Sequence, residues 1–434
     1  MKNLLRDKDV TKYCVDTLKK LGADKSQVNY THLIKKEMCV EGDKVSLLRT
    51  IHTDEVYLKA IKNNKEASLK INKINKTNLE EACKNVLALA SSSPADLHKD
   101  IAAQDEARSF SHGPKEPNFD QMYLKLMNFK QVALRKYPKI ILRDVILFHK
   151  YSKQFIQNSN GVDFEAGNGS YEMFTMFTAK DGKNTSSFNY DAITRMNLDG
   201  DFISWGQIDE LLRQTQLQTV LRPVPENFVA DVILTPLCLL DMLMYLGNEL
   251  KDGKHITNTS LMKGKLNQLV LSKKFTLKAL AVGDEFAEKC FVTPDGFRAD
   301  NLTVFEKGVL KSNLLSQYGA NKTSQGRAKN YGVNFLVESG EKSLGDMIKG
   351  IKKGILLQRF SGGMPAANGD FSGVAKNSFY IDNGEVSYPV NETMITGNII
   401  DMFKNIENIS SDFVNYGHSI MPWIQSSGLH ISGK

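Results

Sequence analysis

Residue types of a hydrolase triad lie close together in the last part of the chain. Asp412, His418 and Ser419 could act as orienting acid, base and nucleophile, in which the histidine takes the proton of the serine hydroxyl. A triad is defined by its geometry, however, and these three residue types often occur together by chance. We therefore favour ordinary loop or strand residues, and keep a stand-alone hydrolase using these three side chains as an alternative.

The distribution of histidine and cysteine gives no local metal pair. None of the eight histidines lies within four residues of another, and the His-Glu-x-x-His pattern is absent. The five cysteines are an odd number, widely scattered, and contain no Cys-x-x-Cys pair. This pattern excludes a disulfide framework and a cysteine zinc site, and fits a reducing cytoplasm. The Gly-x-Ser-x-Gly, P-loop and Gly-x-Gly-x-x-Gly signatures are also missing.

Glycine-rich segments are the remaining candidates for binding. Residues Arg359 to Gly373 read RFSGGMPAANGDFSG, and such a loop can expose backbone N–H groups to an extended ligand. The equally weighted alternative is a wide hairpin with several positive φ angles. The segment Tyr318 to Lys329 could bind an anion, although a solvated turn is favoured. Gly167-Asn-Gly-Ser lacks the lysine of a phosphate loop, so we expect a hairpin turn there.

The first part of the chain shows the pattern helix, strands, helix. Apolar residues recur at helical spacing over residues 10–21 and 78–90, the second with Thr77 or Asn78 as its expected N-cap. This order predicts a sheet with helices packed on one face. The expected strands are Val28–Val40, Val45–His52, Glu55–Ile61 and Ala67–Ile71, with a hairpin turn at Glu41-Gly42-Asp43.

A second helix-and-strand portion follows a long connection over residues 91–117. A helix is predicted at 119–137, and another at 209–221. Arg222-Pro-Val-Pro225 is stiff and extended, so we place the domain boundary there. The prediction is an α+β protein, with an N-terminal sheet-and-helix domain over 1–222 and a β-rich domain over 223–434. The strands expected in the second portion are Ile140–Tyr151, Lys153–Asn158, Val162–Ala179 and Thr185–Tyr190.

Composition excludes several protein classes. The 434 residues are 41% hydrophobic and 24% charged, which is typical of a folded globular protein. The apolar segment Val229 to Leu246 contains Asp231, Pro236 and Asp241, so no membrane span is expected, and the first ten residues lack the apolar stretch of a secretory signal.

Residues 1–150 hold 28 Lys and Arg against 19 Asp and Glu. These lysines are interleaved with apolar residues, so nucleic-acid binding is not favoured.

Three sequence blocks resemble the TldD/PmbA family, whose members have also been called modulators of DNA gyrase. Their order and spacing are similar to those of the family's C-terminal domain. The blocks are Asp295-Gly-Phe-Arg with Leu302 to Leu310, Leu315 to Gly326, and Asn368-Gly-Asp-Phe-Ser-Gly373 with Tyr380 to Val390 and Ile395 to Phe403.

The resemblance implies two subunit types that pair into a peptidase. The TldD type carries a metal-binding His-Glu-x-x-x-His helix and a later cysteine, which the PmbA or TldE type lacks. Here Asp241 and Leu246 stand about where the histidines would be, and Met242 where the glutamate would be. Leucine and methionine cannot bind zinc and activate water as imidazole and carboxylate do. The resemblance therefore implies a PmbA/TldE-like member with no metal, cofactor or catalytic residue of its own, and Cys238 and Asp241 are expected to pack and cap.

The same resemblance implies a function within a complex. The expected partner is a TldD-like metalloprotease subunit or a second copy of the chain, and the expected substrates are small or unfolded peptides. Activity is not expected from the chain alone. The alternative is a binding protein that modulates DNA gyrase or nucleic acid. The expected substrate-binding residues are Gly362, Gly363, Gly369, Asp370, Ser372 and Gly373.

Overall fold

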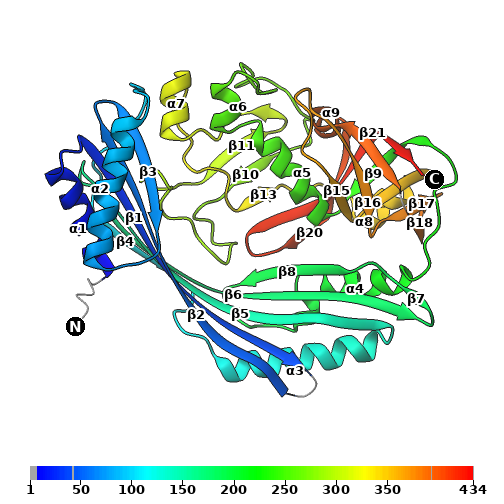
Figure 1. The fold of residues 1–434 in the computed structure, drawn as a ribbon. Coiled ribbons are helices and arrows are strands. Elements are labelled where there is room, and N and C mark those ends of the chain that lie inside the picture. The colour runs from blue at the N-terminus through cyan, green and yellow to red at the C-terminus, as the bar shows by residue number, and fades with distance from the viewer. Residues whose placement is uncertain (1–6, 42–43, 392, 434) are drawn as a thin grey trace.

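Two large sheets organise the chain in the computed structural model, which describes residues 7–41, 44–391 and 393–433. Strands β1 to β8 form the first sheet and strands β9 to β21 the second (Figure 1). The α+β class is confirmed. The predicted turn at Gly42 and Asp43 lies outside the described residues.

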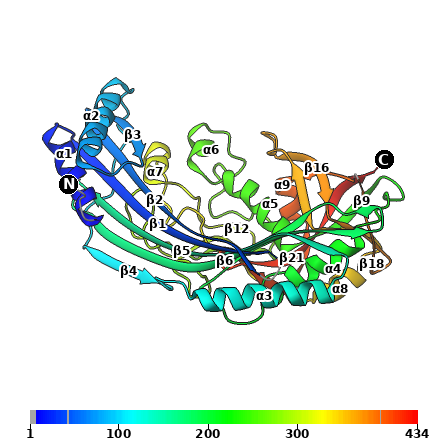
Figure 2. The same cartoon turned by 60° about the horizontal axis from the view of Figure 1, so that its bottom comes forward.

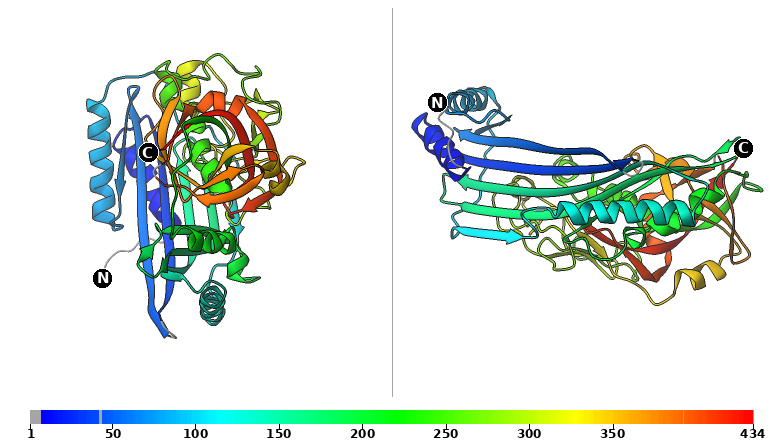
Figure 3. Two further views of the ribbon diagram at one scale, coloured as in Figure 1. Left: turned by 90° about the vertical axis from the view of Figure 1, so that its right-hand side faces the viewer. Right: turned by 90° about the horizontal axis from the view of Figure 1, so that it is seen from below.

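The first sheet has the strand order β3-β2-β1-β5-β6-β4, and β7 and β8 also pair with β6. Its long strands run side by side and curve along their length, and the second half of the chain lies against them (Figures 2 and 3). The strands are β1 Lys25–Glu41, β2 Lys44–Lys62, β3 Lys65–Ile71, β4 Arg108–His112, β5 Ile140–Asn158, β6 Asp163–Asp181, β7 Asn184–Thr185 and β8 Asn189–Arg195.

Helices cover the two ends of this sheet (Figure 1). Helices α1 and α2 bury Cys14, Leu79, Cys83 and Val86 against β1 and β2 at one end, and α3 covers the other. The predicted helices are confirmed, but the N-cap of α2 is Asn75, whose side chain accepts from the Asn78 N–H. The helices are α1 Asp7–Lys20, α2 Lys76–Ser92, α3 Phe119–Lys136, the short 3-10 helix η1 Phe202–Ser204 and α4 Ile208–Leu217.

Several predicted boundaries in this half were wrong. The strands expected at 45–52 and 55–61 form the single strand β2, and those at 140–151 and 153–158 form β5. The connection over 91–117 contains strand β4. The glycine segment at 167–170 lies inside β6 and forms no turn. Position 169 requires glycine because a Cβ there would be 1.8 Å from the Pro114 carbonyl oxygen. Glycine there lets another segment cross the strand closely.

The second sheet has the order β12-β11-β10-β13-β21-β9-β14-β17-β18, with β15, β16, β19 and β20 attached beside it. Helix α5 packs against β9 and β21 in its core. The strands are β9 Phe228–Leu234, β10 Leu277–Ala279, β11 Leu302–Glu306, β12 Val309–Leu310, β13 Phe335–Val337, β14 Lys353–Leu357, β15 Arg359–Gly362, β16 Asp370–Lys376, β17 Phe379–Asp382, β18 Glu385–Pro389, β19 Met394–Asn398, β20 Ile406–Asn415 and β21 Ser419–Ser432. The helices are α5 Pro236–Asn248, α6 Asp252–Ile256, α7 Gln317–Thr323, α8 Leu344–Lys349 and α9 Ile399–Lys404.

The two halves share buried apolar residues. Val414 and Tyr416, next to the second sheet, belong to the same core cluster as Met173 and Ile193 of the first. Arg222 forms an isolated bridge with Val390, which holds the connecting segment against the second half. The domain division at residue 222 stays a prediction. Among the described helices, none combines the length and apolar character that a bilayer span requires.

Candidate functional site

Helix α5 occupies the position where the family resemblance places a metal-binding helix. Thr235 caps its N-terminus by accepting from the Cys238 N–H, and Pro236 follows at the first helical position. The Thr235 hydroxyl also donates to the Gln358 carbonyl oxygen at 3.0 Å, which ties the helix to the segment that enters β15. The apolar residues of α5 face the core, which positions the helix firmly.

The side chains of α5 do not fit a zinc ion. Met242 and Leu246 are fully buried in the apolar core, and neither offers a nitrogen or carboxylate ligand. Burial raises the pKa of the Cys238 thiol well above its ordinary value, so this thiol stays protonated. Asp241 is exposed at its side chain and has only a carboxylate to offer. Among the described residues, no three His, Cys, Asp or Glu side chains form a group able to hold a metal.

A fixed guanidinium, that of Arg359, lies close to this helix instead. Arg359 begins β15, donates from Nε to Asn189 Oδ1 at 3.2 Å and from Nη2 to the Tyr190 carbonyl oxygen, and lies 3.8 Å from the Tyr190 ring centroid. Its charge lowers the pKa of Asp241 and of Asp191, against the larger opposing effect of desolvation on both. A guanidinium donates hydrogen bonds but cannot polarise water as a Lewis acid does.

Asp191 forms a buried polar centre beneath Arg359. Its carboxylate accepts from the backbone N–H groups of Ala192 at 2.9 Å and Gln207 at 3.4 Å. Burial raises its pKa to about 6. The Tyr416 hydroxyl donates to Gln207 Oε1 at 3.1 Å, so this centre joins β8 to the loop after β20. Asn189 was not predicted because its partner Arg359 lies 170 positions further along the chain, and Asp191 was not predicted because its burial depends on the fold.

The predicted substrate-binding segment forms the β15–β16 hairpin. Gly362 pairs with Gly373 across it, and the Phe360 ring fills the space beside both. A Cβ at Gly373 would lie 2.4 Å from Phe360 Cζ, and one at Gly362 would lie 2.6 Å from the same ring. These two glycines, the last pair of the hairpin before its loop, are therefore required by packing.

A second set of contacts fixes the far end of the loop. Gly369 is buried with φ +91°, and Asn398 Nδ2 donates to Asp370 Oδ1 and to the Asn368 carbonyl oxygen, both at 2.9 Å. The Asn398 Oδ1 atom caps α9 by accepting from Ile400 and Asp401. Two segments that carry the family resemblance, around residues 368 and 396, thus meet in space.

The tip and the outer edge of the hairpin are open. Nothing lies within 4 Å of a Cβ built at Gly363, and the neighbouring Met364 is 63% exposed. Asp370 and Ser372 are exposed as well, since they alternate along β16 with the buried Phe371 and Gly373. Among the described strands, β15 pairs only with β16, so its other edge has free backbone donors and acceptors.

The three triad residue types are not brought together. The Asp412 carboxylate accepts from the Leu344 N–H at 2.7 Å, near the start of α8. The Ser419 hydroxyl is buried without a hydrogen-bond partner. Burial lowers the pKa of His418, and its ring lies beside Tyr416. Since no hydrogen bond joins any two of these three described side chains, the stand-alone hydrolase has no support.

Lysines of the predicted anion loop and many lysines of the basic N-terminal third form ion pairs with carboxylates. The loop begins with α7, and its Lys322 and Lys329 pair with Asp96 and Asp300, each at 2.8 Å. Many lysines of the first sheet are paired in the same way. Examples are Lys25 with Asp100, Lys36 with Glu116, Lys59 and Lys99 with Glu66, Lys70 with Glu55 and Lys150 with Glu172.

Comparison with known proteins places this geometry in a family. The sequence profile of the PmbA/TldA metallopeptidase C-terminal domain matches residues 228–433. A metalloprotease PmbA homolog from Buchnera aphidicola is 32% identical over 142 residues, which cover 31% of this chain and 32% of that protein. A zinc metalloprotease TldD homolog from Saccharolobus solfataricus is 22% identical over 91% of this chain and 90% of that protein.

Solved structures share the fold over the whole chain. TldE from Thermococcus kodakarensis superposes with a TM-score of 0.83 at 18% identity, over 97% of this chain and 99% of that chain. A proposed modulator of DNA gyrase from Bacteroides thetaiotaomicron gives 0.86 at 20% identity, over 98% and 99%. The alignment to the Buchnera protein spans about a third of its length. Profile and relatives agree that residues 228–433 belong to the TldD/PmbA family as its C-terminal domain, and the fold of the whole chain is similar to that of TldE.

Proposed function

We propose that this chain is a PmbA/TldE-like subunit that has no metal of its own and takes part in the breakdown of small or unfolded peptides. Its partner would be a TldD-like metalloprotease subunit, or a second copy of the chain. In this proposal a TldD-like partner supplies the zinc and the activated water, which a second copy of the chain, with the same α5, could not do. The chain supplies a binding surface, the β15–β16 hairpin, along which the peptide lies.

The composition of α5 is the single observation that carries the proposal. A metal-dependent peptidase needs nitrogen, oxygen or sulfur ligands and an acid or base within reach of one water molecule. At the matching positions this chain has a carboxylate and two buried apolar side chains, beside a guanidinium that already contacts Tyr190 and Asn189. Such a helix supports the domain but cannot carry the hydrolytic step.

The β15–β16 hairpin supports a role in peptide binding. An extended peptide can add to a free strand edge through its backbone groups, which gives affinity without a sequence requirement. The exposed edge of β15, with Gly363 and Met364 at the tip, provides such a surface next to α5. We therefore keep Gly362, Gly363, Gly369, Asp370, Ser372 and Gly373 as proposed residues of the peptide path, with Gly363, Asp370 and Ser372 as direct contacts and Gly362, Gly369 and Gly373 as supports.

The test combines metal analysis with reconstitution. The full chain is purified alone, and its zinc content and its hydrolysis of an unfolded peptide are measured. It is then mixed with a TldD-type subunit from the same organism. We expect less than about 0.1 zinc per chain alone, no hydrolysis alone, and a complex on gel filtration whose peptidase activity exceeds that of the partner alone.

Two results would contradict the proposal. One zinc per purified chain would show that this protein holds a metal by itself. Failure to alter the activity of the TldD-type subunit, in a mixture that nevertheless forms a complex, would remove the proposed role in the peptide path. An Asp241→Asn variant serves as the control, since it removes the remaining carboxylate of α5 and should leave the activity of the mixture unchanged.

A further inference from the structure

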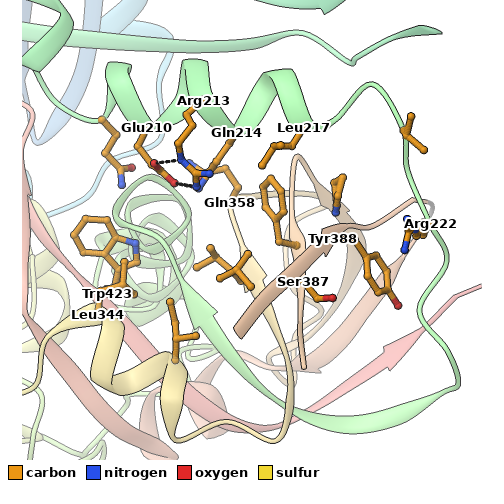
Figure 4. A pocket seen from close by; sticks show the side chains of 17 residues that line it. Glu210, Arg213, Gln214, Leu217, Arg222, Leu344, Gln358, Ser387, Tyr388 and Trp423 are labelled. Atoms are coloured by element: carbon orange, nitrogen blue, oxygen red, sulfur yellow. Dashed lines mark hydrogen bonds and ion pairs between the residues drawn. The ribbon is translucent and has the colours of Figure 1, made fainter. Parts of the chain in front are cut away.

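A cavity separate from the β15–β16 hairpin lies between the two halves of the chain. It has a volume of about 480 Å³ and lies between α4 on one side and α8, β17 and β18 on the other. Figure 4 shows Leu344 and Trp423 at one end of its lining. Tyr388 and Arg222 lie at the other end, and Leu217 of α4 lies between the two ends (Figure 4). Small-ligand sites in proteins commonly measure about 300 to 1,000 Å³ and favour such boundaries between domains.

Apolar side chains form most of the lining, and several of them are open to solvent. Leu217 is 49% exposed, Val220 is 54% exposed and Val386 is 37% exposed. The lining continues with Leu356 and Phe379, which are buried. Single exposed apolar residues are common on protein surfaces, but several around one concavity are typical of a binding groove. The lining therefore favours a ligand that carries an apolar chain.

Three of the described residues that line the cavity are charged, and only one of them has no ion-pair partner in the described part of the chain. The Arg213 guanidinium donates to both Glu210 oxygens, at 2.7 and 2.6 Å, so these two charges compensate each other. The third is Arg222, an exposed residue that forms no such pair. The lining therefore carries one uncompensated positive charge, which favours an anionic group on the ligand.

The position of Arg222 is fixed by its backbone and by one aromatic ring. Its N–H donates to the Pro389 carbonyl oxygen and its carbonyl oxygen accepts from the Asn391 N–H, both at 3.0 Å. Pro223 follows directly and restricts Arg222 to extended backbone conformations. The guanidinium carbon lies 5.5 Å from the centroid of the Tyr388 ring, which also lines the cavity. These contacts hold the guanidinium beside the cavity and use none of its N–H donors.

We propose that this cavity binds an apolar carboxylic acid of about eight carbons. The carboxylate would accept two hydrogen bonds from the Arg222 guanidinium, whose planar fork matches it. The apolar chain would lie against Leu217, Val386 and Phe379, where its burial adds to affinity. At about 30 Å³ for each of roughly ten non-hydrogen atoms, such an acid needs about 300 Å³, which the cavity can hold. The proposal concerns this chain alone, so it can fail or succeed independently of the metallopeptidase complex.

The first experiment compares ligands that differ in chain length or in charge. Octanoate, hexanoate and 1-octanol are titrated into the full chain, and binding is followed by the fluorescence of Trp423, which lines the cavity. The chain's other tryptophan, Trp205, is buried and does not line it. We expect saturable binding of octanoate and roughly tenfold weaker binding of hexanoate, which has two fewer CH₂ groups. Raising the salt concentration from about 0.05 to 0.5 M should weaken the binding of octanoate but not that of 1-octanol.

Substitutions then separate the contact with the carboxylate from the contact with the chain. Arg222→Gln should lower the ratio of octanoate affinity to 1-octanol affinity roughly fivefold, because only the acid pairs with the guanidinium. Leu217→Gln should weaken both ligands by the same factor, roughly threefold, because it removes apolar surface from the lining. Arg143→Gln is the matched control, since Arg143 is an exposed arginine of β5 that does not line the cavity. It should leave the affinity ratio at its wild-type value.

Two sources of ligand share this chemistry, namely fatty acids and the C-terminal end of an apolar peptide. N-acetyl-leucyl-leucine, titrated in the same way, distinguishes them. Tighter binding of octanoate assigns the site to a fatty acid, and tighter binding of the dipeptide assigns it to a peptide C-terminus. Either result supports the proposal, and in both cases Arg222→Gln should weaken the acid that binds more tightly.

Three outcomes would overturn the proposal. They are absence of saturable binding by either octanoate or the dipeptide up to about 10 mM, equal affinity for hexanoate and octanoate, and an unchanged ratio of octanoate to 1-octanol affinity in Arg222→Gln. Should Arg222→Gln fail to fold, the salt dependence of the wild-type chain decides the question. The same salt dependence for octanoate and 1-octanol would show that no charge of the protein contacts the carboxylate.

Discussion

The loop of the β15–β16 hairpin contains glycine for different reasons at two neighbouring places. The Gly362–Gly373 pair closes the loop and is here called the base, and Gly363, the first residue of the loop, is here called the tip. At the base, Gly362 and Gly373 leave room for the Phe360 ring, and a methyl group at either would collide with it. At the tip, Gly363 meets no other atom within 4 Å, so packing does not require glycine. The glycines of this motif therefore do not share one role. A substitution at Gly362 or Gly373 would disturb packing, so only a substitution at an unpacked position such as Gly363 can test ligand binding.

The largest effect that sharpens this comparison is expected beneath the base, at Asp191. Its pKa is raised from 3.8 to about 6 by burial, so the folded protein keeps a proton that the unfolded chain releases between these pH values. The contribution of Asp191 to stability is therefore present below pH 3.8 and is lost as the pH rises to 6. Relative to wild type, Asp191→Asn should gain up to about 3 kcal/mol between pH 4 and pH 7, which urea unfolding at both values would measure.

The control for Asp191 removes a carboxylate from the surface. Asp199 is an exposed residue of the same half, and Asp199→Asn should change the stability difference between the two pH values by less than about 0.5 kcal/mol. If Asp191→Asn follows the same pH dependence as wild type, folding does not raise the pKa of Asp191, and the buried centre beneath Arg359 is described wrongly.

The next effect concerns the base itself. In Gly373→Ala the added methyl group would lie 2.4 Å from Phe360 Cζ and 2.7 Å from the Ser361 carbonyl oxygen, so both must move. We expect a loss of about 2 kcal/mol in the free energy of unfolding, as for other overpacked sites. The same measurement on Gly373→Ala combined with Phe360→Leu should recover part of the loss, because the ring is the main obstacle. No recovery would place the strain in the backbone contact instead.

How far the sequence predicted this site depends on how local each feature is. The apolar face of α5 and its cap at Thr235 and Pro236 depend on neighbouring residues, and the family resemblance indicated a helix there. The hairpin was one of two equally weighted readings of residues 359–373. In contrast, β2 and β5 were each split in two, because polar residues interrupt their alternation although both strands continue through them.

The features that were missed depend on distant partners. Arg359 lies beside Asn189 and Tyr190, about 170 positions earlier, and the cavity lined by α4 and α8 has residues from both halves. Gly169 suggested a turn by its residue type, but a crossing by Pro114 explains it. Spacing in a sequence carries no information about such contacts.

A smaller effect is expected where the loop end is fixed, at Asn398. Asn398→Ala removes the cap of α9 and both donations to the loop, and should cost about 1 kcal/mol. Asn398→Ser keeps a capping oxygen but loses the amide donor to Asp370. Thermal unfolding should therefore place the serine variant between wild type and the alanine variant. If the two variants are equally destabilised, the donations to the loop matter more than the cap.

The smallest effect on stability, and the most informative one for function, is expected at the tip. Gly363→Ala should change the free energy of unfolding by less than about 0.5 kcal/mol, because the added methyl group meets only solvent. If a peptide passes along this tip, Gly363→Val should raise the KM of the reconstituted complex roughly tenfold, which equals about 1.4 kcal/mol of lost binding, with kcat unchanged. Ala366→Val, at an exposed position of the same loop, is the matched control for added bulk. Equal kinetics for wild type and both valine variants would mean that the tip, although open, does not touch the substrate, and would leave the outer edge of β15 as the surface to test.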